Sequence, residues 1–327
     1  MQSNKISVVL PSYNRIEMIG ETLDRVLTQT LPATEIIVVD DGSTDGTREF
    51  LVNYDDRVRV IEIPNSGELI ARNTGLRVAS GDLVAFCDSD DLWQPVHLEQ
   101  MARFWTGQAM PICAYADFRE VRDRLWSDVS KFEMAPPGYW DKLVPVHADG
   151  GVFRDSIVGD LLRFQPFFPS CMMVDRARFL ALGGWDEGVS RLVGCDFATT
   201  LRVAEHPPIG VLQQPTVGIR KHAGNFSGDV LRMNLGDADV LAHVLATRPT
   251  LARYAKEIEA SIVERRQAGF DTAFATGDFT AARRVAGLLD GQLGAARRIK
   301  NRVAHLPEPI RRGVWRGLTR LGSRFSA

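Results

Sequence analysis

Short runs rich in Val and Ile alternate with amphipathic stretches between residue 5 and about residue 120, and this alternation limits the possible folds most. Near-continuous apolar runs are typical of strands that are buried on both faces. Amphipathic segments between such strands favour helices that cover both faces of a mostly parallel sheet. The sequence therefore predicts an α/β fold with a site at the carboxyl ends of its strands.

The predicted elements can be placed by residue number. Strands are expected at 5–11, 34–41, 57–64, 82–88 and 111–121, and helices at 17–30, 44–54, 67–80 and 95–105. The stretch from about 122 to 168 is rich in aromatic residues, Pro and Gly and is predicted to be irregular. A strand at 170–174, two helices and a returning strand at 208–222 are expected to follow.

Beyond residue 228 the composition turns to Ala, Leu and Arg at helical spacing, without a strand pattern. We therefore predict an α/β domain at 1–227 and a helical region at 228–327. Within the latter, the sequence of residues 270–289 predicts a helical hairpin broken at Gly277-Asp278.

Charge is distributed unevenly along the chain. The net charge is −2, but residues 293–327 hold nine Lys or Arg and one Glu, so this segment carries +8 and the remainder −10. Drawn as a helix, residues 306–327 have an apolar face opposite a face of arginines. The apolar face consists of Ile310, Val314, Trp315, Leu318, Leu321 and Phe325, and the arginines are Arg312, Arg316, Arg320 and Arg324. This pattern favours peripheral contact with anionic lipid; the alternative is a helix that packs on the acidic body of its own chain.

Other classes of protein are disfavoured. The four cysteines stand far apart without a C-x-x-C pair, which argues against a zinc site or a disulfide scaffold. The sequence shows neither a secretory signal nor an apolar run long enough to cross a membrane. We expect a cytoplasmic protein, peripheral on the inner face of the plasma membrane through residues 306–327, and no nucleic-acid partner.

Polar motifs follow four successive predicted strands. They begin at Pro11 (PSYNR), Asp40 (DDGSTD), Asn65 (NSGELIARN) and Asp88 (DSDD). Acidic groups crowded at one sheet edge repel each other unless a cation lies between them. A divalent metal that bridges a diphosphate would relieve this repulsion, and Mg²⁺ or Mn²⁺ prefers such oxygen ligands. The first strand lacks the glycine-rich motif of dinucleotide-binding folds.

Taken in this order, together with GGWDE at 183–187 and GCD at 194–196, the motifs resemble the family 2 glycosyltransferases with a GT-A fold. The resemblance covers about residues 5–227, and implies a nucleotide-sugar-binding half at 1–120 and an acceptor-binding half at 121–227. It implies inverting transfer of a sugar from a nucleotide diphosphate to a hydroxyl of a glycan or lipid-linked acceptor, in bacterial surface polysaccharide synthesis. A UDP-sugar donor and a Mn²⁺ or Mg²⁺ cofactor are expected.

The resemblance also assigns site residues. Those implied for the nucleotide sugar are Pro11, Tyr13, Asn14, Arg15, Asp41, Arg72, Asp88, Ser89 and His222, with Asp41 accepting from the base. Asp90 is implied as the main metal ligand, with Asp88 and His222 beside it. Trp185, Asp186 and Asp91 are expected on the acceptor side, although Asp91 is also compatible with a structural role and Trp185 with a packing role.

Asp196 matches the position of the general base. The residue before it, Cys195, departs from the pattern, because many relatives have Glu there. Two other classes of protein remain open, namely a phosphatase-type hydrolase with Asp88 as nucleophile and a nucleotide-sugar-binding protein without turnover. The sequence does not specify the donor sugar, the nucleotide base, the acceptor or the oligomeric state.

Overall fold

The chain forms two compact units in the computed structural model, which describes residues 4–107, 109–222, 228–289 and 291–322. The first unit holds the described residues up to Arg191 and again from Cys195 to His222. The second holds Leu192–Gly194 and the described residues from Gly228 onwards. The predicted domain boundary at residue 227 lies outside the described residues and stays a prediction.

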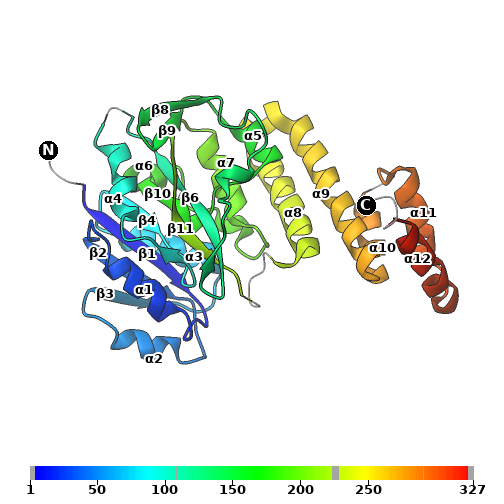
Figure 1. Ribbon diagram of the computed structural model, residues 1–327, viewed down its shortest axis with the longest axis horizontal. Helices are drawn as coiled ribbons and strands as arrows, with labels where there is room; N and C mark the ends of the chain where they lie inside the picture. Colours follow the sequence, from blue (N-terminus) through cyan, green and yellow to red (C-terminus); the bar gives the residue numbers. More distant parts are fainter. Residues whose placement is uncertain (1–3, 108, 223–227, 290, 323–327) are drawn as a thin grey trace. The chain divides into compact units, whose positions relative to one another are not determined.

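Four parallel strands form one half of the central sheet of the first unit (Figure 1). Their spatial order is β3 (Val58–Glu62), β2 (Glu35–Asp40), β1 (Ile6–Ser12) and β4 (Leu83–Phe86). All seven residues of β1 are buried, as expected for a strand covered on both faces. The register pairs Ser12 with Asp40, so the loops that follow β1 and β2 leave the sheet side by side. The four predicted strands are confirmed.

The other half of the sheet is mixed. Beyond β4 the order continues with β10 (Met172–Asp175), β6 (Cys113–Arg122), β11 (Ile209–Arg220), β9 (Gly150–Phe153) and β8 (Leu143–His147). Two short strands lie off this path: β5 (Leu92–Trp93) pairs with β11, and β7 (Leu125–Trp126) pairs with β6. Here β6 and β11 are parallel and the other pairs are antiparallel. The strands predicted at 111–121, 170–174 and 208–222 are confirmed.

Successive side chains of β1 point to opposite faces of the sheet. Since all of them are buried, both faces need a cover, and helices provide it. Val8 and Leu10 share a core cluster with Ile19 of α1. Val9 faces α3 on the other side, where a Cβ added to Gly75 would lie 2.4 Å from Val9 Cγ1. Helix α3 can therefore approach the sheet this closely only with glycine at position 75. The helices of this unit are α1 (Ile19–Leu27), α2 (Thr47–Val52), α3 (Glu68–Val78), α4 (His97–Ala102), α5 (Val158–Arg163), α6 (Arg176–Ala181) and α7 (Asp196–Ala204).

The stretch from 122 to 168 is more regular than predicted. It contains β7, β8, β9 and α5, and β9 pairs with the distant strand β11. Strand pairing with residues about 60 positions away leaves no local pattern, which explains why the sequence indicated a loop. Aromatic rings pack together around this segment: Phe132, Tyr139, Trp140, Phe153, Phe164 and Phe167.

The second unit is helical in its described residues. It contains α8 (Val230–Thr247), α9 (Ala255–Thr276), α10 (Phe279–Leu288), α11 (Gly294–Ala304) and α12 (Glu308–Gly322). The predicted break is confirmed, because Gly277 ends α9 with a φ of 79° and Asp278 caps α10 by accepting from the Ala281 amide at 2.9 Å.

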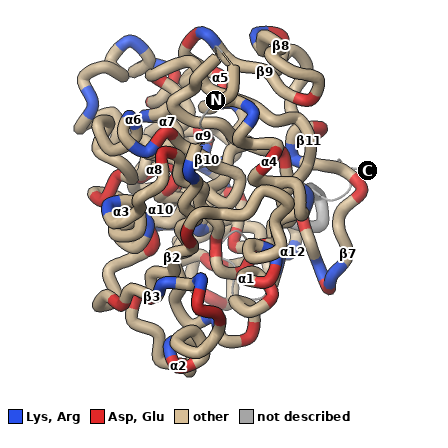
Figure 2. Tube along the Cα trace, turned by 90° about the vertical axis from the view of Figure 1, so that its left-hand side faces the viewer, with Lys and Arg blue, Asp and Glu red and all other residues tan. Residues whose placement is uncertain are grey.

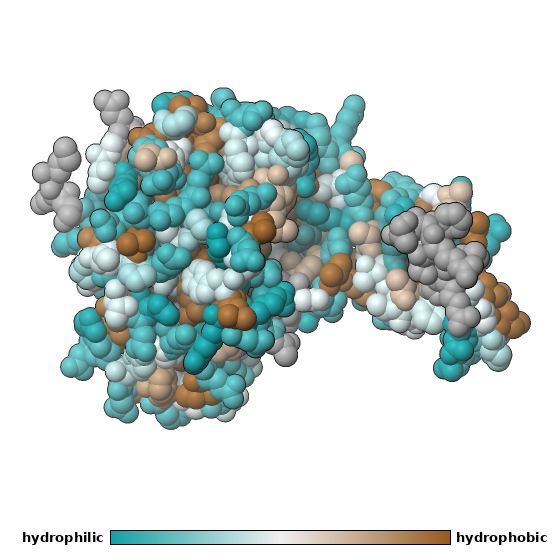
Figure 3. All heavy atoms as spheres, viewed as in Figure 1, coloured by the Kyte–Doolittle hydropathy of each residue, from teal (hydrophilic) through white to brown (hydrophobic). Residues whose placement is uncertain are grey.

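The predicted tail helix is confirmed as α12, and it packs within its own unit. The Trp315 indole donates to the Phe274 carbonyl at 2.7 Å and contacts the Phe279 ring edge-on. Ile310 and Val314 remain exposed, as does Ile299 of α11. Figure 3 shows apolar side chains on the surface at this end of the unit. Phe325 of the predicted apolar face lies outside the described residues.

All four cysteines are free and buried. Among the described residues, none of the helices combines the length and the apolar character needed to cross a bilayer. Acidic and basic residues are interspersed along the trace of the first unit in the view of Figure 2.

Candidate functional site

The structure brings together the polar motifs that follow β1, β2 and β4. The Asn14 amide donates to Ser43 Oγ at 2.9 Å, and Asn14 Oδ1 accepts from the Thr44 amide at 2.8 Å. Asn14 has a φ of 52°, a left-handed conformation that asparagine tolerates better than most residues. Pro11 is buried, while Tyr13 is 46% exposed and presents its ring at the surface.

Asp41 connects the β2 loop to the start of α3. Its two carboxylate oxygens accept from the backbone amides of Ser66 at 2.6 Å and Gly67 at 2.9 Å. The side chain of Asn65 donates to the Asp41 carbonyl at 3.1 Å. Asp41 therefore fixes the loop at 65–67, and its predicted contact with a base remains a prediction.

Asp90 contacts Arg15 and His222 through one carboxylate oxygen. His222 Nε2 is 2.9 Å from Asp90 Oδ2, and Arg15 Nε is 3.6 Å from the same oxygen. Burial disfavours the charged carboxylate, but the hydrogen bond with His222 and the charge of Arg15 outweigh it and lower the pKa of Asp90. Asp90 is therefore ionised and is held by side chains from two separate segments of the chain.

Asp88 is paired with a buried arginine. Arg72 Nη2 donates to Asp88 Oδ1 at 2.6 Å, and the guanidinium lies 4.9 Å from the centre of the Trp185 ring. Burial alone would lower the pKa of Arg72, but Asp88 and Glu68 together raise it. Burial, together with Glu68 and Asp90, raises the pKa of Asp88 in spite of Arg72.

Asp91 and Ser89 are held by the protein itself. Asp91 is buried and accepts from Ser170 Oγ at 2.5 Å and from the Arg220 amide at 2.9 Å. Ser89 is also buried, and its carbonyl accepts from Thr22 Oγ1 at 3.2 Å. For Asp91, these contacts favour the structural alternative over a contact with an acceptor.

Trp185 lies in the core, only 2% exposed, with its ring edge-on to Phe86. Asn73 holds its backbone: Asn73 Oδ1 accepts from the Trp185 amide, and Asn73 Nδ2 donates to the Trp185 carbonyl, both at 2.9 Å. Asp186 pairs with Arg202 at 3.1 Å. The burial of Trp185 favours packing over substrate contact.

Asp196 is half-buried in the first turn of α7, directly after Cys195. The Cys195 thiol donates to Glu68 Oε1 at 3.0 Å, and Glu68 Oε2 lies 3.5 Å from Arg72 Nη2. Contacts thus connect the backbone beside Asp196 to the Arg72–Asp88 pair through Glu68. Glu68 was not predicted as a site residue, although its spacing of four residues from Arg72 on a helix was an available signal.

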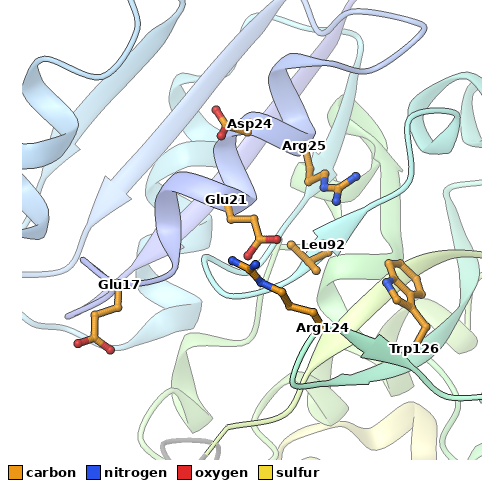
Figure 4. A pocket seen from close by; sticks show the side chains of 7 residues that line it. All are labelled: Glu17, Glu21, Asp24, Arg25, Leu92, Arg124 and Trp126. Atoms are coloured by element: carbon orange, nitrogen blue, oxygen red, sulfur yellow. The ribbon is translucent and has the colours of Figure 1, made fainter.

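Two cavities lie near this region of the first unit. One, of about 350 Å³, is lined by Asp40, Gly42, Ser43, Arg48, Glu62, Ile63 and Pro64. The other, of about 500 Å³, lies between α1 and the β5 and β7 strands and contains none of the predicted site residues (Figure 4). It is lined by Glu17, Glu21, Asp24, Arg25, Leu92, Arg124 and Trp126, and Arg124 points toward Glu21.

The architecture is that of a GT-A glycosyltransferase. The first 349 residues of S. aureus TarS, crystallised with UDP-GlcNAc, superpose with a TM-score of 0.59 at 21% identity, covering 94% of this chain and 92% of that one. Residues 7–156 match the family profile described as "Glycosyl transferase family 2". This part of the chain belongs to that family.

Two relatives illustrate the range of matches. The chain is 44% identical to TuaG of Bacillus subtilis over 115 residues, 34% of this chain and 44% of TuaG. It is 30% identical to the validoxylamine A glucosyltransferase of Streptomyces hygroscopicus over 253 residues, 69% of this chain and 58% of that enzyme. The chain therefore spans less than two thirds of the length of either relative.

The Asn73 contacts predict a specific stability effect. Asn73→Ala would leave the buried amide and carbonyl of Trp185 without their partners, and each unmet buried group costs about 1–3 kcal/mol. We expect the free energy of unfolding, measured by urea denaturation, to fall by at least that amount. The control is Thr74→Ala on the same helix, whose hydroxyl donates only to the Ile70 carbonyl, and which should change stability by about 0.5 kcal/mol or less. Equal effects of the two substitutions would contradict the assignment.

Proposed function

We propose that this protein is an inverting glycosyltransferase that moves a sugar from a nucleotide diphosphate sugar to a hydroxyl of a glycan or lipid-linked acceptor. The observation that carries the proposal is the convergence of Asp88 and Asp90 with two arginines, Arg15 and Arg72, and with His222. Such a mixture of carboxylates and fixed cations suits a diphosphate leaving group.

The known proteins support the choice of substrates. TarS 1-349 was crystallised with UDP-GlcNAc and with UDP, which favours a UDP-sugar as donor here. TuaG is named for teichuronic acid biosynthesis, which favours an acceptor in bacterial surface polysaccharide synthesis. On the donor side we assign Pro11, Tyr13, Asn14, Arg15, Asp41, Arg72, Asp88, Ser89 and His222.

Asp196 is the proposed general base. The acceptor hydroxyl attacks the anomeric carbon, the bond from that carbon to the diphosphate oxygen breaks, and the diphosphate leaves with the electron pair. The hydroxyl proton goes to the Asp196 carboxylate. A single displacement of this kind inverts the anomeric configuration and needs no nucleophile from the enzyme.

Mn²⁺ or Mg²⁺ is the proposed cofactor. Asp90 and His222 converge to 2.9 Å, but no three His, Cys, Asp or Glu side chains in the described part of the chain are arranged to hold a metal. The residues fit a metal whose remaining ligands are phosphate oxygens of the donor, as hard cations prefer. When bound, such an ion supplies Lewis-acid stabilisation of the departing diphosphate. The chain's own Arg72 holds Asp88 in place.

The hydrolase alternative is less well supported, because residues 7–156 match the profile of a glycosyltransferase family. Asp88 Oδ1 accepts from the buried Arg72 at 2.6 Å, but the Asp88 side chain is 28% exposed, so its accessibility does not separate the two functions. Comparison of phosphomonoesters with UDP-sugars as substrates separates the two functions. Turnover of the phosphomonoesters alone would favour the hydrolase.

The metal assignment predicts the behaviour of Asp90→Ala. Transfer should be abolished and UDP binding with Mn²⁺, measured by calorimetry, should weaken, because a metal ligand and the partner of His222 are both lost. Asp128→Ala, which removes an exposed carboxylate, should leave both unchanged. Full transfer activity in excess EDTA would show that no divalent ion is needed.

The assignment of the base predicts a different pattern for Asp196→Asn. We expect kcat to fall by about 10²–10⁴-fold while the Kd for the donor is unchanged, since the residue acts on the acceptor. The matched control is Asp175→Asn, because Asp175 caps α6 by accepting from the Arg178 amide. NMR of the product gives its anomeric configuration. Near-normal turnover, or retention of the donor's configuration, would overturn the assignment.

We also propose peripheral membrane contact through residues 306–327. The exposed Ile310 and Val314 lie on a helix that carries Arg311, Arg312 and Arg316, which suits an anionic lipid surface. Trp315 belongs to the packing of the unit itself and is not needed for this contact.

The membrane proposal is tested without removing the helix. Ile310→Ser/Val314→Ser should reduce sedimentation of the protein with phosphatidylglycerol vesicles several-fold, because both apolar anchors are lost. Leu288→Ser, on the exposed surface of α10, serves as the control for loss of an apolar side chain. Unchanged sedimentation of the double variant would refute membrane contact through this surface.

A further inference from the structure

Glu68 combines a fixed position with an exposed carboxylate. It lies in the first turn of α3, and its side chain is 52% exposed, whereas its partners Arg72 and Cys195 are only 1% and 2% exposed. The Cys195 thiol donates to Oε1 at 3.0 Å, and Arg72 Nη2 lies 3.5 Å from Oε2. An exposed glutamate side chain is normally flexible and is not held by buried partners in this way.

The anchor at Cys195 is a neutral donor. Burial, followed by the negative charge of Glu68, raises the pKa of the Cys195 thiol, so the sulfur keeps its proton and donates it to Oε1. The contact fixes the carboxylate without neutralising its charge. Glu68 therefore presents a directed negative charge beside the backbone that carries Asp196.

The contact also brings an acidic side chain to the residue next to Asp196. Residue 195, directly before the proposed base Asp196, is a cysteine, so the acidic group that meets this position comes from another element. In the structure the carboxylate of Glu68, from α3, reaches that same residue. An acidic group from α3 therefore contacts the residue that directly precedes Asp196.

We propose that Glu68 is a positioning and specificity residue for the acceptor. It accepts a hydrogen bond from a sugar hydroxyl adjacent to the one that Asp196 deprotonates. Because the carboxylate is charged, it selects neutral, hydroxyl-bearing sugars and disfavours acceptors with a carboxylate at that place. This inference rests on the proposed glycosyltransferase function and extends it to the class of acceptor.

The competing explanation is that Glu68 only balances the charge of Arg72. That role would act on the donor side, through the Arg72–Asp88 pair. The two explanations differ in which substrate responds to substitution, and measurements of donor and acceptor separate them.

The experiment uses the full chain with Mn²⁺, UDP-glucose and UDP-N-acetylglucosamine as donors, and p-nitrophenyl glucoside and glucuronide as acceptors. For Glu68→Ala we expect the acceptor KM for the glucoside to rise about 10–100-fold, the effect of losing a hydrogen bond to a charged group. The preference for glucoside over glucuronide should fall with it. Donor Kd and donor hydrolysis without acceptor should be unchanged.

Three further variants and one control extend the test. Cys195→Ser keeps a donor to Glu68 and should behave like wild type, whereas Cys195→Ala should raise the acceptor KM part of the way. Glu68→Ala/Cys195→Glu places the carboxylate at residue 195 and should recover most of the acceptor affinity. Glu49→Ala, in the first turn of α2, is the control for loss of an exposed carboxylate.

The outcomes are distinct. A weaker donor Kd with an unchanged acceptor KM would assign Glu68 to Arg72 and overturn the proposal. A lower thermal midpoint of Glu68→Ala without a change in KM or acceptor preference would overturn it as well. If the wild-type protein transfers no sugar, the proposed function fails and this inference fails with it. If the wild type transfers sugar and Glu68→Ala leaves the acceptor preference unchanged, only the proposed role of Glu68 is refuted.

Discussion

A buried guanidinium organises the candidate site. Arg72 is taken out of water and surrounded by the Asp88 carboxylate, the Glu68 carboxylate and the face of Trp185. Burying a charge is costly unless it is paired, so these partners are required for the arginine to be tolerated. Because they come from α3, from the end of β4 and from the segment before α7, one side chain sets the relative position of three parts of the site.

The sheet supplies the geometry on which this arrangement depends. Parallel β1, β2 and β4 end at one edge, so the motifs that follow them meet although they lie dozens of residues apart. Carboxylates gathered in this way repel one another. Arg15 and a hydrogen bond with His222 stabilise Asp90, and Arg72 is paired with Asp88. Each of these two carboxylates thus has its own partners at this edge of the sheet, and these partners fix its orientation.

Much of this was predictable from the sequence, and the limits have physical causes. The strands, the helical hairpin at Gly277 and the meeting of the strand-end motifs follow from local periodicity and turn residues. The pairing of β9 with β11 was not predictable, because a hairpin that depends on a distant strand has no local signature. The role of Trp185 was left open, and Glu68 was missed, for a related reason. Whether a tryptophan faces the core, or a glutamate meets a thiol 127 residues away, is decided by tertiary packing.

The close approach of α3 to the sheet has a consequence for how such a protein can change over time. Glu68, Arg72 and Asn73 all lie within two turns of Gly75, the residue that lets the helix lie against Val9. Any larger side chain at that position would push the helix outward and carry all three with it. The residue at position 75 in the core and the site residues on the same helix therefore cannot change independently. Substitutions in the core beneath α3 are constrained by the site residues that the same helix carries.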